Sequence, residues 1–398
     1  MLIHRRKFLQ TGSLVSGAFM LPKFLKAIDS RPFRQDNRVL VVLQLSGGND
    51  GLNTVIPVRN DIYYRERPGL SIPKEKSLGL DSEAGLHPSL SNLKELYDEG
   101  NLAILNNVGY PNPDRSHFRS MDIWQTASGS NEYLNSGWLG RYLDAQCENC
   151  SKPTQVLEMD DTLSLALSGE HLKGIALRDP KRLYETSRDP FYKNMLDARD
   201  REKPDDPASY LYKVMAETIS GADYIFQQSQ LRPSKTIYPD SEIGKNLKTI
   251  ASLISSDINT RVYYVSLGSF DTHVGQKAKQ EKLFKDLNDA IKPFTDDLKS
   301  SHHFEDTLMI SFSEFGRRVS ENASSGTDHG TANNMFLIGG ALKNKGVLNP
   351  MPDLSNLTDG DLNQQVDFKS VYATVLKKWL RADDLQILGK QYGYLDFI

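Results

Sequence analysis

The chain has 398 residues, a length that suits one large α/β domain with insertions or two average domains. Hydrophobic residues make up 38% of it and charged residues 25%, which is typical of globular proteins. The formal net charge is -3, so charge gives no reason to expect nucleic acid or an anionic membrane as a partner. Two cysteines are too few for a disulfide scaffold or a zinc ribbon.

The N-terminus carries two adjacent arginines, Arg5 and Arg6, followed after one spacer by Phe8 and Leu9. This pattern resembles the twin-arginine translocation signal. The apolar stretch behind it, residues 14–21, is too short to span a bilayer comfortably. The alternative interpretation is a basic amphipathic N-terminal helix.

We therefore expect a twin-arginine signal peptide and linker over residues 1–35 and one exported domain over residues 36–398. The twin-arginine translocase would be a partner during export. The domain would be periplasmic or extracellular, and it would stay tethered to the membrane if the signal is not cleaved. This route carries folded proteins, so it is compatible with metal loading before export.

Strands and helices alternate along the rest of the chain. Continuous apolar runs such as 39–43 are typical of strands buried on both faces of a parallel sheet. The predicted strands are 38–45, 102–108, 155–159, 174–177, 261–267, 307–312 and 334–338, and the predicted helices are 88–97, 118–126, 209–230, 241–256, 276–301 and 368–380. This alternation predicts an α/β fold with a mainly parallel central sheet and helices on both faces.

Two further segments stand out between these elements. Residues 179–207 are rich in charge and proline, and we interpret them as an insertion or surface excursion of the domain. Cys147 and Cys150 have C-x-x-C spacing. They form either a loop pair or small local disulfide, or a thioredoxin-like redox site. The residues before them do not follow a clear strand, which favours the first interpretation.

Polar side chains gather next to the predicted strands, at the edge where functional groups of parallel sheets collect. They are Asn49, Asp50, Ser116, His117, Asp271, His273, Glu314, Asp328 and His329. Asp, Glu and His bind zinc, manganese or iron, and carboxylates alone suit magnesium or calcium. A single such residue also serves as a helix cap or hydrogen-bond partner. Their recurrence on five segments predicts a polar or metal site.

Five motifs resemble a known family and occur in its order. They are LSGGNDGLNTVIP at 45–57, DRSHF at 114–118, FDTHVGQ at 270–276, SEFGRR at 313–318 and GTDHGTAN at 326–333. Through them the chain resembles domain-of-unknown-function family 1501 over nearly its whole length after residue 36. That family looks like a remote relative of the alkaline phosphatase and sulfatase superfamily, so the resemblance implies an alkaline-phosphatase-like fold.

The resemblance also implies two metal ions, a nucleophile at a helix N-terminus, and transfer of a phosphoryl or sulfuryl group. Carried over by position, it implies metal-ligand roles for Asp50, Asp271, His273, Glu314 and His329, a catalytic role for Ser116 as nucleophile and for Arg115, and substrate contacts from Asn49, His117, Arg317 and Asp328. Arg115, Arg317 or Arg318 would clamp the anionic group.

The chain departs from the superfamily pattern at three points. Asp271 and His273 are closer in sequence than the usual ligand pair, and Phe315 follows Glu314 where a second imidazole is usual. The sulfatase signature C-x-P-x-R is absent, so formylglycine chemistry is not expected. The expected number of metal ions therefore falls from two to one or none.

These observations give one leading hypothesis and two alternatives. The first is a metal-dependent hydrolase of a small phosphate or sulfate ester, with zinc, manganese, magnesium or calcium as the divalent ion. The second is an exported binding or assembly protein that retains the fold without the chemistry. The third is a purely structural role for the polar residues. Neither the substrate nor the oligomeric state follows from the sequence.

Overall fold

A computed structural model describes residues 37–146, 153–197 and 207–398 of the protein. The N-terminal signal and the Cys147–Cys150 pair lie outside the described residues. The described part is built on one large sheet of nine strands. In spatial order the sheet contains β11 (Gly346–Val347), β5 (Leu102–Gly109), β10 (Asn333–Ile338), β9 (Thr307–Phe312), β1 (Val39–Leu45), β8 (Val262–Leu267), β6 (Val156–Glu158) and β7 (Ile175–Ala176), and β14 (Val366–Asp367) pairs with β5.

The sheet lies at the centre because its strands are apolar on both faces. All seven residues of β1 are buried. Leu40 and Val42 point into one hydrophobic core, which also contains Trp124. Val41 points into a second core on the opposite face, together with Phe284. A strand buried in this way needs a helical layer on each side.

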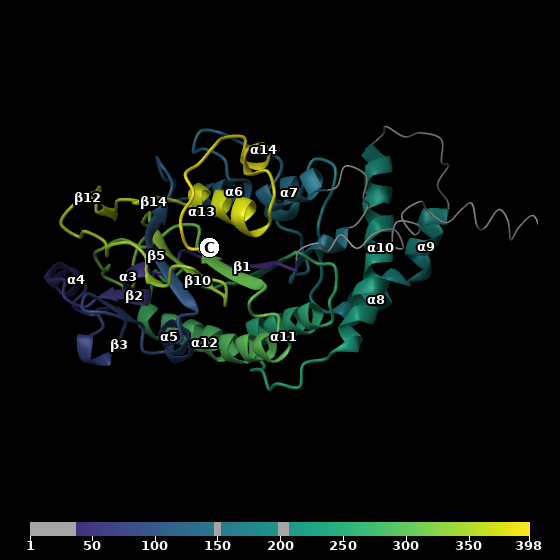
Figure 1. The fold of residues 1–398 in the computed structure, drawn as a ribbon. Coiled ribbons are helices and arrows are strands. Elements are labelled where there is room, and N and C mark those ends of the chain that lie inside the picture. The colour runs from purple at the N-terminus through teal and green to yellow at the C-terminus, as the bar shows by residue number, and fades with distance from the viewer. Residues whose placement is uncertain (1–36, 147–152, 198–206) are drawn as a thin grey trace, which may run out of the picture.

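Helices cover both faces of the sheet (Figure 1). One face carries α6 (His117–Thr126), α7 (Trp138–Gln146), α13 (Phe368–Thr374) with a π-helical continuation over Val375–Trp379, and α14 (Asp384–Leu388); the other carries α5 (Ser91–Asp98), α11 (Glu242–Ser255) and α12 (Gln276–Ser300). The predicted α/β class, with a mainly parallel sheet between helical layers, is confirmed.

Three helices stand together at one end of the molecule (Figure 1): α8 (Pro180–Ser187), α9 (Pro190–Asp197) and α10 (Pro207–Leu231). The ring of Tyr184 on α8 stacks on Phe226 of α10, with centroids 4.5 Å apart. The described part of the charged segment 179–207 is therefore helical and packs on a neighbouring helix. Its status as an insertion stays a prediction.

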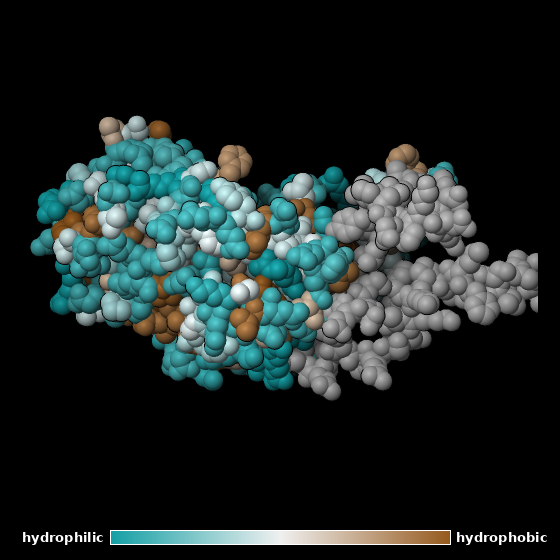
Figure 2. Space-filling view, turned by 90° about the horizontal axis from the view of Figure 1, so that it is seen from above, coloured by the Kyte–Doolittle hydropathy of each residue, from teal (hydrophilic) through white to brown (hydrophobic). Residues whose placement is uncertain are grey.

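Smaller elements complete the fold. They are α3 (Gly51–Thr54), α4 (Asp61–Glu66), a three-stranded sheet of β2 (Val55–Pro57), β4 (Ala84–Leu86) and β3 (Leu78–Gly79), a hairpin of β12 (Leu357–Thr358) and β13 (Asp361–Leu362), and 3-10 turns at Lys74–Lys76, Pro153–Gln155 and Leu165–Leu167. Within the described residues, no helix has the length and apolarity needed to cross a membrane. Figure 2 shows a mainly hydrophilic surface with small, scattered hydrophobic areas.

One strand, β10, is antiparallel to its neighbours in the sheet, and its direction determines which loops meet at one edge. β1 is parallel to β8 and β9, whereas β10 is antiparallel to both β9 and β5. The start of β10 therefore lies at the edge where β1, β5, β8 and β9 end. A loop that precedes β10 meets the loops that follow the other strands.

Candidate metal centre

Four side chains from three segments meet at this edge. His117 is the first residue of α6, Asp271 and His273 follow β8, and His329 precedes β10. His117, Asp271 and His329 offer ligand atoms that all lie within 4.8 Å of one another.

His273 lies even closer to two members of this group. Its Nε2 is 3.1 Å from Asp271 Oδ1 and 2.9 Å from His329 Nε2. His329 Nε2 is 3.3 Å from the same Asp271 oxygen, and His117 Nε2 is 3.6 Å from Asp271 Oδ2. We call these four residues the His/Asp cluster.

The three imidazoles of the cluster are each held through Nδ1. Nδ1–H of His117 donates to Glu314 Oε1 at 2.9 Å, and Nδ1–H of His273 donates to Asp328 Oδ1 at 3.2 Å. The third histidine, His329, donates from Nδ1 to the backbone carbonyl of Arg115 at 2.8 Å. A carbonyl only accepts, so the Nδ1 of His329 carries the proton and its Nε2 presents a lone pair when the ring is neutral. Metal-binding histidines are oriented in this way.

Asp271 is held in its ionised form by a buried arginine. The Arg317 guanidinium donates to Asp271 Oδ1 at 2.7 Å and to the carbonyls of Gly48 and Thr327. Partial burial raises the pKa of Asp271, but the hydrogen bond and charge of Arg317 outweigh it and hold that pKa below its usual value. Arg317, predicted to bind substrate, is fully buried and organises the loops behind the cluster.

The other histidine pKa shifts follow from the same contacts. The hydrogen bond to Glu314 raises the pKa of His117, while burial lowers the pKa of His329. The lowered pKa of His329 favours the neutral form of its ring, which is the form that binds metals.

Two predicted metal ligands have other partners in the structure. The Asp50 carboxylate is 1% exposed; Oδ1 accepts from the amides at the start of α3, and Oδ2 pairs with Arg67 at 2.5 Å and also accepts from Gln276. Glu314 Oε1 accepts from the Gly47 amide at 2.8 Å as well as from His117. The structure thus places Asp50 in a buried ion pair and Glu314 behind a histidine, because protein donors already occupy their oxygens.

The residues that the sequence predicted to contact the substrate also have other partners in the structure. Asn49 is buried, and its side chain donates to the Thr54 hydroxyl at 2.8 Å, away from solvent. Asp328 is exposed, and its carboxylate accepts from Nδ1–H of His273. His117, predicted to bind substrate, presents Nε2 to the cluster and has the geometry of a ligand.

The predicted catalytic pair borders the cluster. Ser116 is the exposed N-cap residue of α6, and its side chain makes no capping hydrogen bond. Its hydroxyl lies beside His117 in sequence and at a helix N-terminus, as the motif DRSHF predicted. The side chain of Arg115 pairs with buried Asp361, a residue of β13 that the sequence analysis did not single out.

Glycines let the loops approach this closely. Gly47 has a φ of +117°, and a Cβ there would lie 2.4 Å from the Asp271 amide nitrogen. Only glycine fits a backbone that passes so near another with this φ. Gly47 in the glycine-rich motif after β1 therefore lets this loop pack directly against the backbone of Asp271.

The fold and this cluster define an α/β protein with a candidate metal centre at the carboxyl edge of its sheet. The chain belongs to the family of proteins of unknown function DUF1501, which matches residues 37–384. A comparison with curated proteins finds no match.

Among solved structures, the chain is similar to several enzymes or enzyme-like proteins. A protein of the alkaline phosphatase superfamily from Vibrio parahaemolyticus is 10% identical, with a TM-score of 0.35, and the match covers 91% of this chain and 72% of that one. A sulfatase from Pseudoalteromonas sp. is 12% identical, with a TM-score of 0.36, and the match covers 92% of this chain and 70% of that one. Alkaline phosphatase from the Antarctic bacterium TAB5 is 10% identical, with a TM-score of 0.34, and the match covers 76% of this chain and 92% of that one. At these values, what this chain does has to be inferred from its own residues.

Proposed function

We propose that the protein is an exported hydrolase of a phosphate or sulfate ester that uses a divalent metal ion held by the His/Asp cluster. The observation that carries this proposal is the convergence of lone pairs. With each Nδ1 protonated, the facing Nε2 atoms of His273 and His329 and the Oδ1 atom of Asp271 are all acceptors. Acceptors this close repel one another unless a cation, either a metal ion or an added proton, lies among them.

The spacing of these atoms supports a metal ion. Four-coordinate zinc, with Zn–N bonds of about 2.0–2.1 Å, sets neighbouring ligand atoms about 3.3 Å apart. The three separations here are 2.9, 3.1 and 3.3 Å. The donor set of imidazole and carboxylate also suits manganese. We infer that Asp271, His273 and His329 hold the ion, and that His117, whose Nε2 lies 3.6 Å from Asp271 Oδ2, is the fourth candidate ligand.

Bound there, the ion would polarise an ester oxygen and lower the pKa of a coordinated water or hydroxyl. The protein's own groups supply the rest. We propose that the exposed hydroxyl of Ser116, at the N-terminus of α6 whose amides favour an anion, attacks the phosphorus or sulfur atom of the ester and gives up its proton to water. The bond to the alcohol breaks, and the alcohol leaves with a proton from water while an ester of Ser116 forms. A water molecule then cleaves that ester, which releases phosphate or sulfate and restores the Ser116 hydroxyl. Arg115 holds His329 through its carbonyl, which makes it a positioning residue in addition to its predicted catalytic role.

The test compares metal content with hydrolysis. Purified protein should contain a divalent ion by elemental analysis and should cleave an aryl phosphate or an aryl sulfate. Ser116→Ala should keep the ion and lose most of the turnover, whereas His329→Ala should lose both. A metal-free protein with no turnover after adding zinc or manganese would overturn the proposal.

A second candidate function is a non-catalytic binding protein. It is favoured by the engagement of Asp50 and Glu314 within the protein, because the two-metal ligand set that the resemblance implies is then incomplete. This candidate requires that no ester is cleaved, even by protein that carries its metal ion.

Export is a separate part of the proposal and is supported by the sequence alone. Replacing Arg5 and Arg6 together by lysine should leave the protein in the cytoplasm, because a twin-arginine signal depends on both residues. Cell fractionation with an antibody against the chain measures this. Unchanged export of the double variant would overturn the assignment of residues 1–35.

A further inference from the structure

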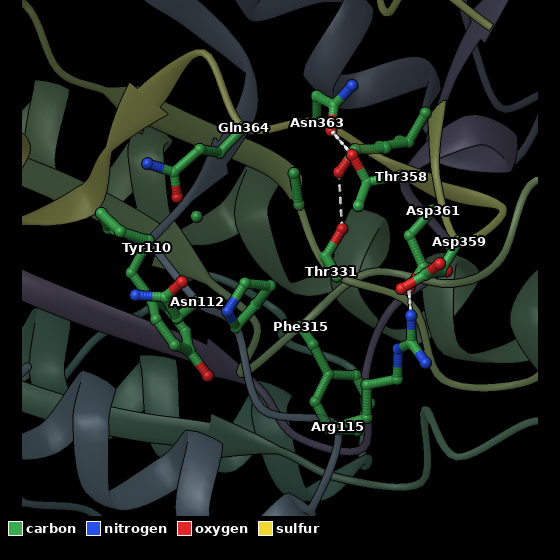
Figure 3. A pocket seen from close by; sticks show the side chains of 15 residues that line it. Tyr110, Asn112, Arg115, Phe315, Thr331, Thr358, Asp359, Asp361, Asn363 and Gln364 are labelled. Atoms are coloured by element: carbon green, nitrogen blue, oxygen red, sulfur yellow. Dashed lines mark hydrogen bonds and ion pairs between the residues drawn. The ribbon is translucent and has the colours of Figure 1, made fainter. Parts of the chain in front are cut away.

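A pocket of about 380 Å³ lies beside the His/Asp cluster, and the proposed reaction leaves it unassigned. Phe315 lines it, and the same ring lies 4.8 Å from the His117 ring and 4.6 Å from the His329 ring, measured between centroids. The β12–β13 hairpin, with Thr358 and Asp361, forms one wall of the pocket (Figure 3). A molecule reaching the cluster could therefore place its remaining part in this pocket.

The pocket contains buried acceptors that lack donors. Asp361 is 1% exposed; its Oδ2 pairs with Arg115, and its Oδ1 lies 3.9 Å from Arg318 Nε, which is beyond hydrogen-bond distance. Among the described residues, Asp361 Oδ1 and Gln364 Oε1 are buried without a hydrogen-bond partner, and both residues line this pocket. Buried acceptors are normally satisfied, so these atoms call for donors from a ligand.

The remaining lining limits the charge of that ligand. Asp359 and Asp361 contribute two carboxylates, and Arg115, the one cation that the described residues place in the lining, is already paired with Asp361. Figure 3 shows Arg115 and Asp361 on one side and Tyr110 and Gln364 on the other. An anionic group has no free partner here, whereas hydroxyl groups can donate to the carboxylate and amide oxygens.

We propose that this pocket binds the uncharged, hydroxyl-rich part of the substrate, such as a sugar ring or polyol, whose anionic ester reaches the His/Asp cluster. The place of the ester in this assignment rests on the proposed function. The place of the hydroxyl groups rests on Asp361 Oδ1 and Gln364 Oε1, the buried acceptors without a hydrogen-bond partner. The volume is that of a small-molecule site, and the rings of Tyr110 and Phe315 offer apolar faces beside the polar groups.

Binding of ester-free probes tests the pocket without any turnover. Calorimetry and saturation-transfer NMR would be run on the full chain with methyl glucoside, N-acetylglucosamine and inositol, with spermidine as a cationic probe. At least one neutral probe should bind. Gln364→Ala should weaken it about fivefold, because one hydrogen bond is lost. The matched control is Gln365→Ala, whose exposed neighbouring amide does not line the pocket.

The outcomes separate this proposal from the proposed function. Loss of neutral-probe binding in Gln364→Ala but not in Gln365→Ala supports the pocket, whether or not an aryl ester is cleaved. Binding of no neutral probe by correctly folded wild-type protein overturns it. Tighter binding of spermidine, weakened by Gln364→Ala, also overturns it and assigns the pocket to amines. Failure of aryl ester hydrolysis alone rejects the hydrolase.

Discussion

Single hydrogen bonds determine which residues of this site can hold a metal ion. His117, His273 and His329 differ in sequence context, yet each is fixed through Nδ1 and presents Nε2 to the same space. Glu314 and Asp328 act through two of these rings. The residue types were visible in the sequence, but the direction of each ring follows from contacts between distant segments.

The support of His117 by Glu314 gives a first prediction. Glu314→Gln removes the negative charge that polarises the imidazole, so metal affinity should fall about 10- to 100-fold. Competition with a chelator measures this change. Glu305→Gln, at an exposed glutamate, is the control and should bind normally. Equal affinity of Glu314→Gln and wild type would contradict the role of Glu314.

The buried pair of Asp50 and Arg67 gives a second prediction. Asp50→Ala leaves the Arg67 charge buried without its partner and should lower the free energy of unfolding by about 3–5 kcal/mol. Urea denaturation measures the stability, and elemental analysis of the folded fraction measures the metal. We expect the ion to be retained. Loss of the ion with unchanged stability would restore the ligand role that the sequence predicted for Asp50.

At the scale of elements, the direction of β10 assembles the site. His329 precedes its strand in sequence, while Asp271 and His273 follow theirs. Only an antiparallel β10 brings both kinds of loop to one edge. The sequence predicted a mainly parallel sheet because apolar runs show burial but carry no information on strand direction.

The loop after β1 packs closely against the loop after β8, and this contact gives a third prediction. Gly47→Ala introduces a Cβ against the Asp271 amide at a left-handed φ, so it should cost about 1–3 kcal/mol and weaken metal binding. Thermal denaturation and metal titration measure both effects. Gly79→Ala is the matched control, since no atom lies within 4 Å of its Cβ position. Normal metal binding by Gly47→Ala would show that Asp271 does not need this packing.

Strong periodic patterns explain which elements the sequence could predict. The apolar runs of β1, β8 and β9 and the amphipathic α12 are continuous enough to be recognised. The β12–β13 hairpin has two-residue strands, too short for any period, and it carries Asp361. The pocket wall was therefore invisible in the sequence.

For the whole molecule, two of the three hydrophobic cores in the described residues pack on opposite faces of the central sheet. A carboxyl group is buried at one end of a strand of this sheet. Glu158 ends β6 and accepts from the Ser164 amide at 2.6 Å. Burial raises its pKa from 4.5 to about 7, against the smaller opposite effect of the Ser164 hydrogen bonds. The folded protein therefore holds a proton that the unfolded chain releases.

This shift gives a fourth prediction. Because the folded state binds more protons between pH 4.5 and about 7, stability should fall as pH rises through that window. Each pKa unit corresponds to about 1.4 kcal/mol, so the shift from 4.5 to about 7 should lower the free energy of unfolding by about 3 kcal/mol across this window. Glu158→Gln should remove this part of the pH dependence in urea denaturation, and the exposed control Glu185→Gln should not. An unchanged slope in Glu158→Gln would contradict the burial of a titrating Glu158.

The central claim is that the His/Asp cluster binds one divalent ion. Native mass spectrometry of the purified chain, before and after chelation and with zinc or manganese restored, tests it most directly. We expect one ion per chain, lost on chelation, regained on addition, and absent from His329→Ala. A chain that stays folded and binds no ion, or a His329→Ala variant that binds it as tightly as wild type, would contradict the assignment.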